Sequence, residues 1–156
     1  FVPFAVNIAA ALGRLTHMPV EDLGFAKVDH HRAIRAGMPE VIFGKGKAPE
    51  HVLHIATHLL ERSPNVLATR LEPGTAALVR ERFPEAEYHP LSGVLRVWRD
   101  KTVHGKGAIV VACAGTSDIP VAEEAVLTAE VMGNQVEMIA DIGVAASTVS
   151  CPTANA

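Results

Sequence analysis

The sequence lacks the features of several large protein classes. It has no basic excess, with 14 Lys and Arg against 17 Asp and Glu and a formal net charge of -3, which argues against nucleic acid as the main partner. No apolar run approaches the ~20 residues that a membrane-spanning helix needs. The apolar opening has neither a basic start nor a clear cleavage site, so no signal peptide is predicted. We therefore expect a cytoplasmic protein, and because the chain starts at Phe1, the true N-terminus is expected upstream.

Cysteine is scarce as well. Cys113 and Cys151 form no CxxC pair and have no metal-ligand spacing, so a disulfide is not expected in a cytosolic chain. Cys113 stands in an apolar run and is interpreted as a small core residue, because a free Cys behaves as a small hydrophobe. The segment Gly44-Lys45-Gly46-Lys47 lacks the full phosphate-loop pattern. It is interpreted as a turn with two solvated lysines.

The residues that are present predict an α/β fold in the first two thirds of the chain. Strands alternate with helices that begin or end at Pro and Gly, which is typical of layered α/β structure. Residues 20–25 are predicted as a connection. Helices are predicted over 4–16, 49–62, 74–82 and part of 29–36, strands over 41–43 and 66–70, and a hairpin within 87–103.

A second unit is predicted to follow a polar boundary around Lys101–Gly107. Strands near 109–113 and 135–142 flank a helix near 119–132, and a crossover helix demands that the two strands be parallel. The apolar run Ile109–Ala112 is typical of a strand buried on both faces. Because two strands make an incomplete sheet, this domain is predicted to be cut short. The expected organisation is an N-terminal region over 1–105, the start of a second domain over 106–145 and an irregular tail over 146–156.

The strongest local signal follows the strand predicted near 109–113. Gly115 lets the backbone approach a ligand closely, and Thr116 and Ser117 place hydroxyls at a helix start, where free N–H groups favour an anion such as phosphate. Asp118 can cap the helix, or it can hold a ribose hydroxyl or a metal ion. A capped strand-to-helix turn without any ligand is the alternative interpretation.

The eight histidines give a weaker signal. His30 and His31 are adjacent, so their side chains diverge on a helix and make a poor metal site. His51, His54 and His58 have a spacing that could place them on one helix face, as zinc would require. A solvated polar face is the favoured interpretation, because the apolar residues of the same helix lie largely elsewhere.

Three sequence blocks, taken in order, carry a resemblance to a known family. They are Glu21-Asp22-Leu23-Gly24-Phe25-Ala26-Lys27-Val28-Asp29-His30-His31-Arg32, then Pro39-Glu40-Val41-Ile42-Phe43-Gly44, then Ala114 to Ala125 with Asp141-Ile142-Gly143-Val144-Ala145. Over roughly residues 11–145 the chain resembles the LarB family, the pyridinium-3,5-biscarboxylic acid mononucleotide synthases of nickel-pincer cofactor biosynthesis. The second unit is similar to aminoimidazole ribonucleotide (AIR) carboxylase, with a flavodoxin-like parallel sheet.

The resemblance implies a reaction and a binding site. The reaction is carboxylation of the pyridinium ring of nicotinic acid adenine dinucleotide, with hydrolysis of the phosphoanhydride and release of AMP. Carbon dioxide or bicarbonate is the implied co-substrate, no tightly bound cofactor is implied, and Mg²⁺ is a candidate ion with Asp118 as its candidate ligand. The turn that binds a ribose phosphate in AIR carboxylase is matched here by Gly115-Thr116-Ser117-Asp118. A homo-oligomer is implied for the full-length protein.

The chain departs from the family pattern after Ala145. The family continues as Gly-x-His-Arg-Leu-Leu, and the cysteine thought to attack the pyridinium ring lies further on. Neither Cys113 nor Cys151 matches that cysteine, so the catalytic residues stay unassigned and this chain is expected to be inactive alone. One permitted set of codons for residues 146–156, read with one added nucleotide, encodes Gly-Ile-His-Arg-Leu-Leu. We therefore hypothesise a frameshift after Ala145, which resequencing of the locus would test.

Two other functions remain open from the sequence. One is AIR carboxylase or mutase of purine biosynthesis, which the long segment before Ala108 disfavours because that enzyme has its nucleotide turn near the N-terminus. The other is a non-catalytic nucleotide-binding module. Binding of nicotinic acid adenine dinucleotide and release of AMP would separate these alternatives.

Overall fold

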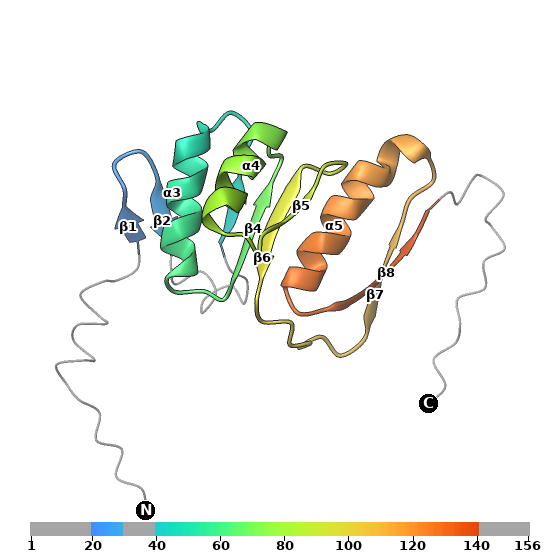
Figure 1. The fold of residues 1–156 in the computed structure, drawn as a ribbon. Coiled ribbons are helices and arrows are strands. Elements are labelled where there is room, and N and C mark those ends of the chain that lie inside the picture. Colours follow the sequence, from blue (N-terminus) through green and yellow to red (C-terminus); the bar gives the residue numbers. More distant parts are fainter. Residues whose placement is uncertain (1–19, 30–39, 141–156) are drawn as a thin grey trace, which may run out of the picture.

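A computed structural model describes residues 20–29 and 40–140 of the chain. The helix predicted over 4–16, most of the stretch 29–36 and the tail over 146–156 therefore lie outside the described residues, as does the proposed frameshift. Within the described ranges, no helix is long and apolar enough to cross a membrane. The fold is mixed α/β (Figure 1).

A small hairpin precedes the main sheet. Strands β1 (Val20–Asp22) and β2 (Lys27–Asp29) pair antiparallel, so the prediction of a simple connection over 20–25 was wrong. The Leu23 N–H donates to the Ala26 carbonyl at 2.8 Å and the Gly24 N–H to Asp22 Oδ1 at 2.9 Å. Gly24 has a φ of 81°, which a side-chain-bearing residue rarely adopts. A three-residue strand pair of this kind has too little periodicity to be seen in the sequence.

The central sheet has four strands in the order β3-β4-β6-β5. They are β3 (Val41–Phe43), β4 (Asn65–Thr69), β5 (Glu87–His89) and β6 (Val94–Trp98). Strand β3 runs parallel to β4, whereas β6 is antiparallel to both β4 and β5. The predicted strands and the predicted hairpin within 87–103 are confirmed.

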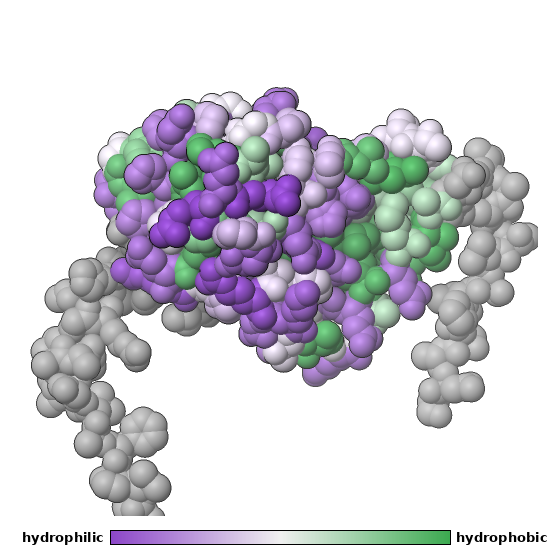
Figure 2. Space-filling model, viewed as in Figure 1, coloured by the Kyte–Doolittle hydropathy of each residue, from purple (hydrophilic) through white to green (hydrophobic). Residues whose placement is uncertain are grey.

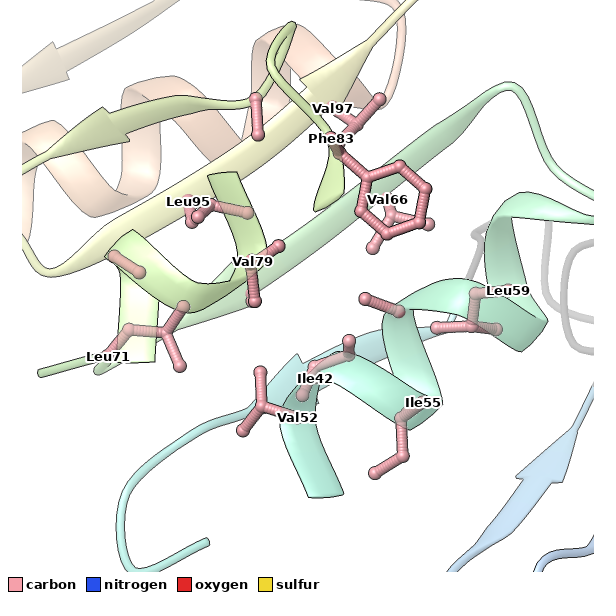
Figure 3. Close-up of a cluster of buried hydrophobic side chains, with 14 residues drawn as sticks. Ile42, Val52, Ile55, Leu59, Val66, Leu71, Val79, Phe83, Leu95 and Val97 are labelled. Atoms are coloured by element: carbon pink, nitrogen blue, oxygen red, sulfur yellow. The ribbon is translucent and has the colours of Figure 1, made fainter. Parts of the chain in front are cut away.

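Helices α3 (Pro49–Leu60) and α4 (Pro73–Arg82) cover one face of this sheet (Figure 1). Both begin with Pro, which suits the first turn because its missing N–H has no partner there anyway. Figure 3 shows apolar side chains of the two helices, and Phe83 directly after α4, facing those of the strands: Val52, Ile55, Leu59, Val79, Phe83, Val66, Leu95 and Val97. Both helices were predicted within two residues of their observed bounds.

Helix α5 (Ile119–Val131) covers the opposite face of the same sheet. Its Leu127 and Val131 pack against Leu67 of β4 and Val94 of β6. Side chains alternate between the two faces of a strand, so Leu67 meets α5 while its neighbour Val66 meets the other helices. Coverage on both faces explains why β4 is an almost continuous apolar run.

Helix α5 also connects two strands of a separate sheet, β7 (Ala108–Ala112) and β8 (Gln135–Ile139). These strands are parallel, with Ile109 opposite Val136, so the predicted β-α-β unit is confirmed. Gly133 follows the helix with a φ of 78°, the left-handed conformation expected of a glycine that ends a helix.

Strand β7 is much more exposed than its sequence suggested. Ile109 is 40% exposed and Val110 54%, so the prediction of burial on both faces is wrong for the part of the chain that the structure describes. Helix α5 lies against the two strands, and no described element covers their other side. Figure 2 shows apolar surface on the side of the molecule where these elements lie.

Candidate functional site

A pocket of about 380 Å³ lies at the C-terminal end of β7. The end of the strand, the following turn and the first half of α5 form its walls. The lining residues are Val111, Ala112, Cys113, Ala114, Asp118, Val121, Ala122 and Ala125. Open α/β sheets bind ligands outside the carboxyl ends of their strands, and this pocket has that position.

A short 3-10 turn, Thr116–Asp118, leads from the strand into α5. The Asp118 N–H donates to the Gly115 carbonyl at 3.0 Å, and the Cys113 N–H donates to the Ile139 carbonyl of β8 at 3.0 Å. These two bonds tie the turn to itself and to the neighbouring strand. The start of α5 is thereby fixed beside the end of β7.

Asp118 is the one residue of the predicted set that lines the pocket. It is exposed and occupies the N-cap position of α5, but its side chain makes no capping hydrogen bond. The capping role that the sequence allowed is therefore not used. The carboxylate is left at the pocket wall, where it could accept hydrogen bonds from sugar hydroxyls or bind a cation.

The other three predicted residues form the adjoining turn. Thr116 and Ser117 are exposed. Gly115 has an extended backbone, and a Cβ atom added there would lie 3.7 Å from Ser117 Oγ and 3.8 Å from Asp118 Oδ2. These are ordinary contact distances, so neither backbone strain nor crowding within the chain requires glycine. Phosphate binding by this turn stays a prediction.

Cys113 was missed as a residue of the site. Cys113 is partly exposed rather than buried, and it lines the pocket. The interpretation of Cys113 as a core residue was therefore wrong. The signal that could have found it is its position, directly after the last residue of β7 and before the turn. Residues that directly follow a parallel strand lie at the edge of the sheet where ligands bind.

Acidic residues on one face of α5 hold the helix against the central sheet. Arg70 Nε lies 2.8 Å from Glu124 Oε2, and the Ser92 N–H donates to Glu123 Oε2 at 3.0 Å. Arg70 adopts a φ of 57°, unusual for a residue with a side chain. The opposite face of α5 supplies Val121 and Ala125 to the pocket, so these contacts position one wall of the site.

Each of the three histidines of α3, His51, His54 and His58, lies close to another side chain. The ring of His51 stacks on Phe25 with centroids 4.1 Å apart, and His54 meets the same ring edge-on. His58 Nδ1 lies 4.0 Å from Glu61 Oε2. Among residues 20–29 and 40–140, no group of three or more His, Cys, Asp or Glu side chains could hold a metal ion.

The fold and the pocket define a mixed α/β protein whose second unit, two parallel strands joined by a helix, is consistent with a flavodoxin-like partial α/β fold. The family model described as LarB/PurE-like N-terminal domain matches residues 20–100, just over half of the chain. The chain belongs to this family, as its three sequence blocks suggested.

A relative in an archaeon extends the similarity. The uncharacterized protein MJ0165 of Methanocaldococcus jannaschii is 32% identical to this chain over 139 residues. The alignment covers 76% of this chain and 49% of the relative. The chain thus spans about half the length of the curated relative that it matches.

Proposed function

We propose that this chain supplies the nucleotide-binding part of a LarB-type carboxylase of nickel-pincer cofactor biosynthesis. The substrate is nicotinic acid adenine dinucleotide, and the reaction joins a carboxyl group from carbon dioxide or bicarbonate to its pyridinium ring in place of a ring hydrogen, which leaves as a proton. Hydrolysis of the phosphoanhydride releases AMP. The observation that carries this proposal is the pocket at the end of β7. The carboxylate of Asp118, which makes no capping hydrogen bond to α5, belongs to a residue that lines this pocket, and the chain is a member of the LarB/PurE-like family.

The residues of the turn suit the parts of a nucleotide. The hydroxyls of Thr116 and Ser117 would donate to phosphate oxygens together with the N–H groups at the helix start. Asp118 would accept hydrogen bonds from the ribose hydroxyls or hold Mg²⁺ beside the phosphates. The apolar wall formed by Val121 and Ala122 would exclude water from the ring.

We assign no nucleophile within this chain. Covalent attack on a pyridinium ring needs a placed and activated nucleophile, and the family's cysteine has no counterpart among Cys113 and Cys151. Residues 1–156 are therefore proposed to bind the nucleotide without carboxylating it. The full-length enzyme is proposed to act as a homo-oligomer in the cytoplasm.

The test is a titration of the chain with nicotinic acid adenine dinucleotide, combined with an assay for AMP. Asp118→Ala should weaken binding at least tenfold, about the contribution of one charged hydrogen bond. The matched control is Glu137→Ala, because Glu137 is an exposed acidic residue on β8 outside the pocket. Equal affinity of the wild type and Asp118→Ala would contradict the proposed site.

The same experiment separates the alternatives when it is extended to an assay for carboxylated product, to titration with aminoimidazole ribonucleotide and to the full-length protein. Carboxylated product from the wild-type chain would show that a nucleophile lies within residues 1–156. It would refute the proposal that these residues bind the nucleotide without carboxylating it. Tighter binding of aminoimidazole ribonucleotide than of the dinucleotide would favour AIR carboxylase. Nucleotide binding by the full-length protein without any AMP release would favour a non-catalytic module.

A further inference from the structure

A second pocket, of about 320 Å³, lies beneath the β1–β2 hairpin. The hairpin is at one end of the molecule and the β7–β8 sheet is at the other (Figure 1), so this pocket is separate from the one at Asp118. Three segments line it: Phe25–Lys27 of the hairpin, Glu40–Phe43 of β3 and its approach, and Lys47 with Ile55 at α3. None of these residues has a role in the proposed carboxylation.

Several contacts hold the hairpin over this space. The Phe25 ring stacks on His51 of α3 at 4.1 Å, and the Asp29 N–H donates to Glu40 Oε2 at 2.5 Å. Leu23 and Ala26 pack against the main apolar core. The hairpin is thus fixed both to α3 and to Glu40, the residue directly before β3.

The lining combines three kinds of group. Its floor is apolar, with Ile42 3% and Ile55 7% exposed. Two phenyl rings flank it and remain open to solvent, Phe25 at 44% and Phe43 at 54% exposure. Lys27 and Lys47 are two exposed cationic residues of the lining, and within the described residues neither forms an ion pair.

We propose that this pocket binds a mononucleotide. The flat base would lie against the exposed ring of Phe43 and the face of Phe25 that His51 does not cover, since base–aromatic stacking is favourable and tolerant of the base. The phosphate would pair with Lys27 and Lys47. Glu40 has one carboxylate oxygen engaged with the hairpin, and its other oxygen would accept a hydrogen bond from a ribose hydroxyl.

The ligand class follows from the combination of these groups. A free phosphate would leave the exposed rings of Phe25 and Phe43 uncovered, whereas an uncharged apolar ligand would leave the two lysines of the lining with only the single carboxylate of Glu40 to balance their charge. The volume of about 320 Å³ is at the small end of the range for small-molecule sites, roughly 300–1,000 Å³. A mononucleotide therefore matches the pocket in size, charge and shape of its ring.

The test is an NMR titration of the ¹⁵N-labelled chain with AMP, which reads the two pockets separately. Amide signals of residues 25–27 and 40–47 should shift, and Lys47→Gln should weaken this binding about tenfold. The control is Lys45→Gln, because Lys45 belongs to the same turn but does not line the pocket. Lys45→Gln and Asp118→Ala should leave the affinity at this pocket within about twofold of the wild type. Adenosine and inorganic phosphate, titrated alone, should each bind more weakly than AMP.

The outcomes are decisive in either direction. Absence of AMP-dependent shifts at residues 25–27 and 40–47 would overturn the proposal, as would equal losses in Lys45→Gln and Lys47→Gln. Inorganic phosphate or adenosine binding as tightly as AMP would also overturn it. The first result would mean that the base adds nothing to binding, and the second that the phosphate adds nothing. Because the proposal does not rest on the carboxylase function, failure at Asp118 would appear separately, as unchanged signals of residues 111–118 on addition of the dinucleotide.

Discussion

Arg96 is the one charged residue that is buried within the described ranges, at 8% exposure. Its Nε lies 2.8 Å from Glu87 Oε2 of β5, and its Nη1 lies 2.5 Å from Glu130 Oε2 of α5. The guanidinium also sits 4.3 Å from the centre of the Trp98 ring. A buried charge is tolerated only when it is paired, and here the pairing joins the central sheet to the second unit.

Replacing Arg96 by Met should lower the free energy of unfolding by about 2 kcal/mol, because hydrogen bonds to charged groups are lost and Glu130 is left without its partner. Urea denaturation measures this change. Arg99→Met is the control, since Arg99 and its partner Glu85 are both more than 40% exposed and such surface pairs contribute little. Similar losses in the two variants would contradict a special role for Arg96.

Acid titration gives a second readout of Arg96. The hydrogen bond from Arg96 lowers the pKa of Glu87 below its ordinary value of 4.5. A carboxyl whose folded-state pKa is lowered contributes stability above its unfolded pKa and loses it as the pH falls through the folded pKa. The difference in stability between wild type and Arg96→Met should therefore be full at neutral pH and shrink below pH 4.5. A difference that stays constant on acidification would exclude this ion pair as its origin.

At the scale of elements, α5 belongs to two structures at once. It is the crossover of the β7–β8 unit, and it also covers one face of the central sheet. Leu127 and Val131 are 4% and 5% exposed against Leu67 and Val94. The two units therefore share a helix. Because α5 also lines the pocket at Asp118, its packing on the central sheet fixes one wall of that pocket.

Leu127→Ala should lower the free energy of unfolding by about 3 kcal/mol, the usual cost of emptying a buried leucine site. Denaturation followed by both Trp98 fluorescence and circular dichroism measures it, and the two probes should give the same midpoint if α5 and the sheet unfold together. Val121→Ala on the exposed face of α5 is the control and should change stability by no more than about 0.5 kcal/mol. Two separate transitions in the wild type would contradict the shared-helix arrangement.

At the scale of the whole molecule, the β7–β8 sheet is the least covered part of the described structure. Four large apolar residues of its strands are exposed: Ile109, Val110, Met138 and Ile139. Apolar surface with unpaired strand edges promotes association between chains. We therefore expect residues 1–156 to self-associate through this surface.

Val110→Lys should reduce this association without lowering the free energy of unfolding, because Val110 is 54% exposed. Sedimentation velocity over a range of protein concentrations measures the change. Val103→Lys is the matched control, since Val103 is similarly exposed at 49% but lies in the connection before β7, and it adds the same charge. If the control dissolves the aggregates equally well, net charge rather than the β7–β8 surface is responsible.

The sequence by itself determined the succession of local elements in most of the described chain. The Pro and Gly residues around α3 and α4, and the apolar run of β7 followed by Gly115, are local signals that hold wherever the segment lies. The parallel pairing of β7 and β8 followed from the same reasoning, because a helix between two strands leaves room for only one direction. The sequence blocks also identified the family, and they placed Asp118 at the end of the strand.

Only the tertiary structure decided which distant segments meet. The β1–β2 hairpin is held by Phe25 on His51 and by Asp29 on Glu40, contacts that no periodic pattern contains. The placement of α5 on the far face of the central sheet depends on Leu127 and Glu130, whose partners lie some thirty or more residues earlier in the chain. Cys113 lies at a pocket rather than in the core because the covering of β7 depends on neighbouring elements, not on its own apolar residues. Local propensity sets which segments become strands and helices. Burial and charge pairing between segments far apart in the sequence decide which faces of the sheets are covered by other elements.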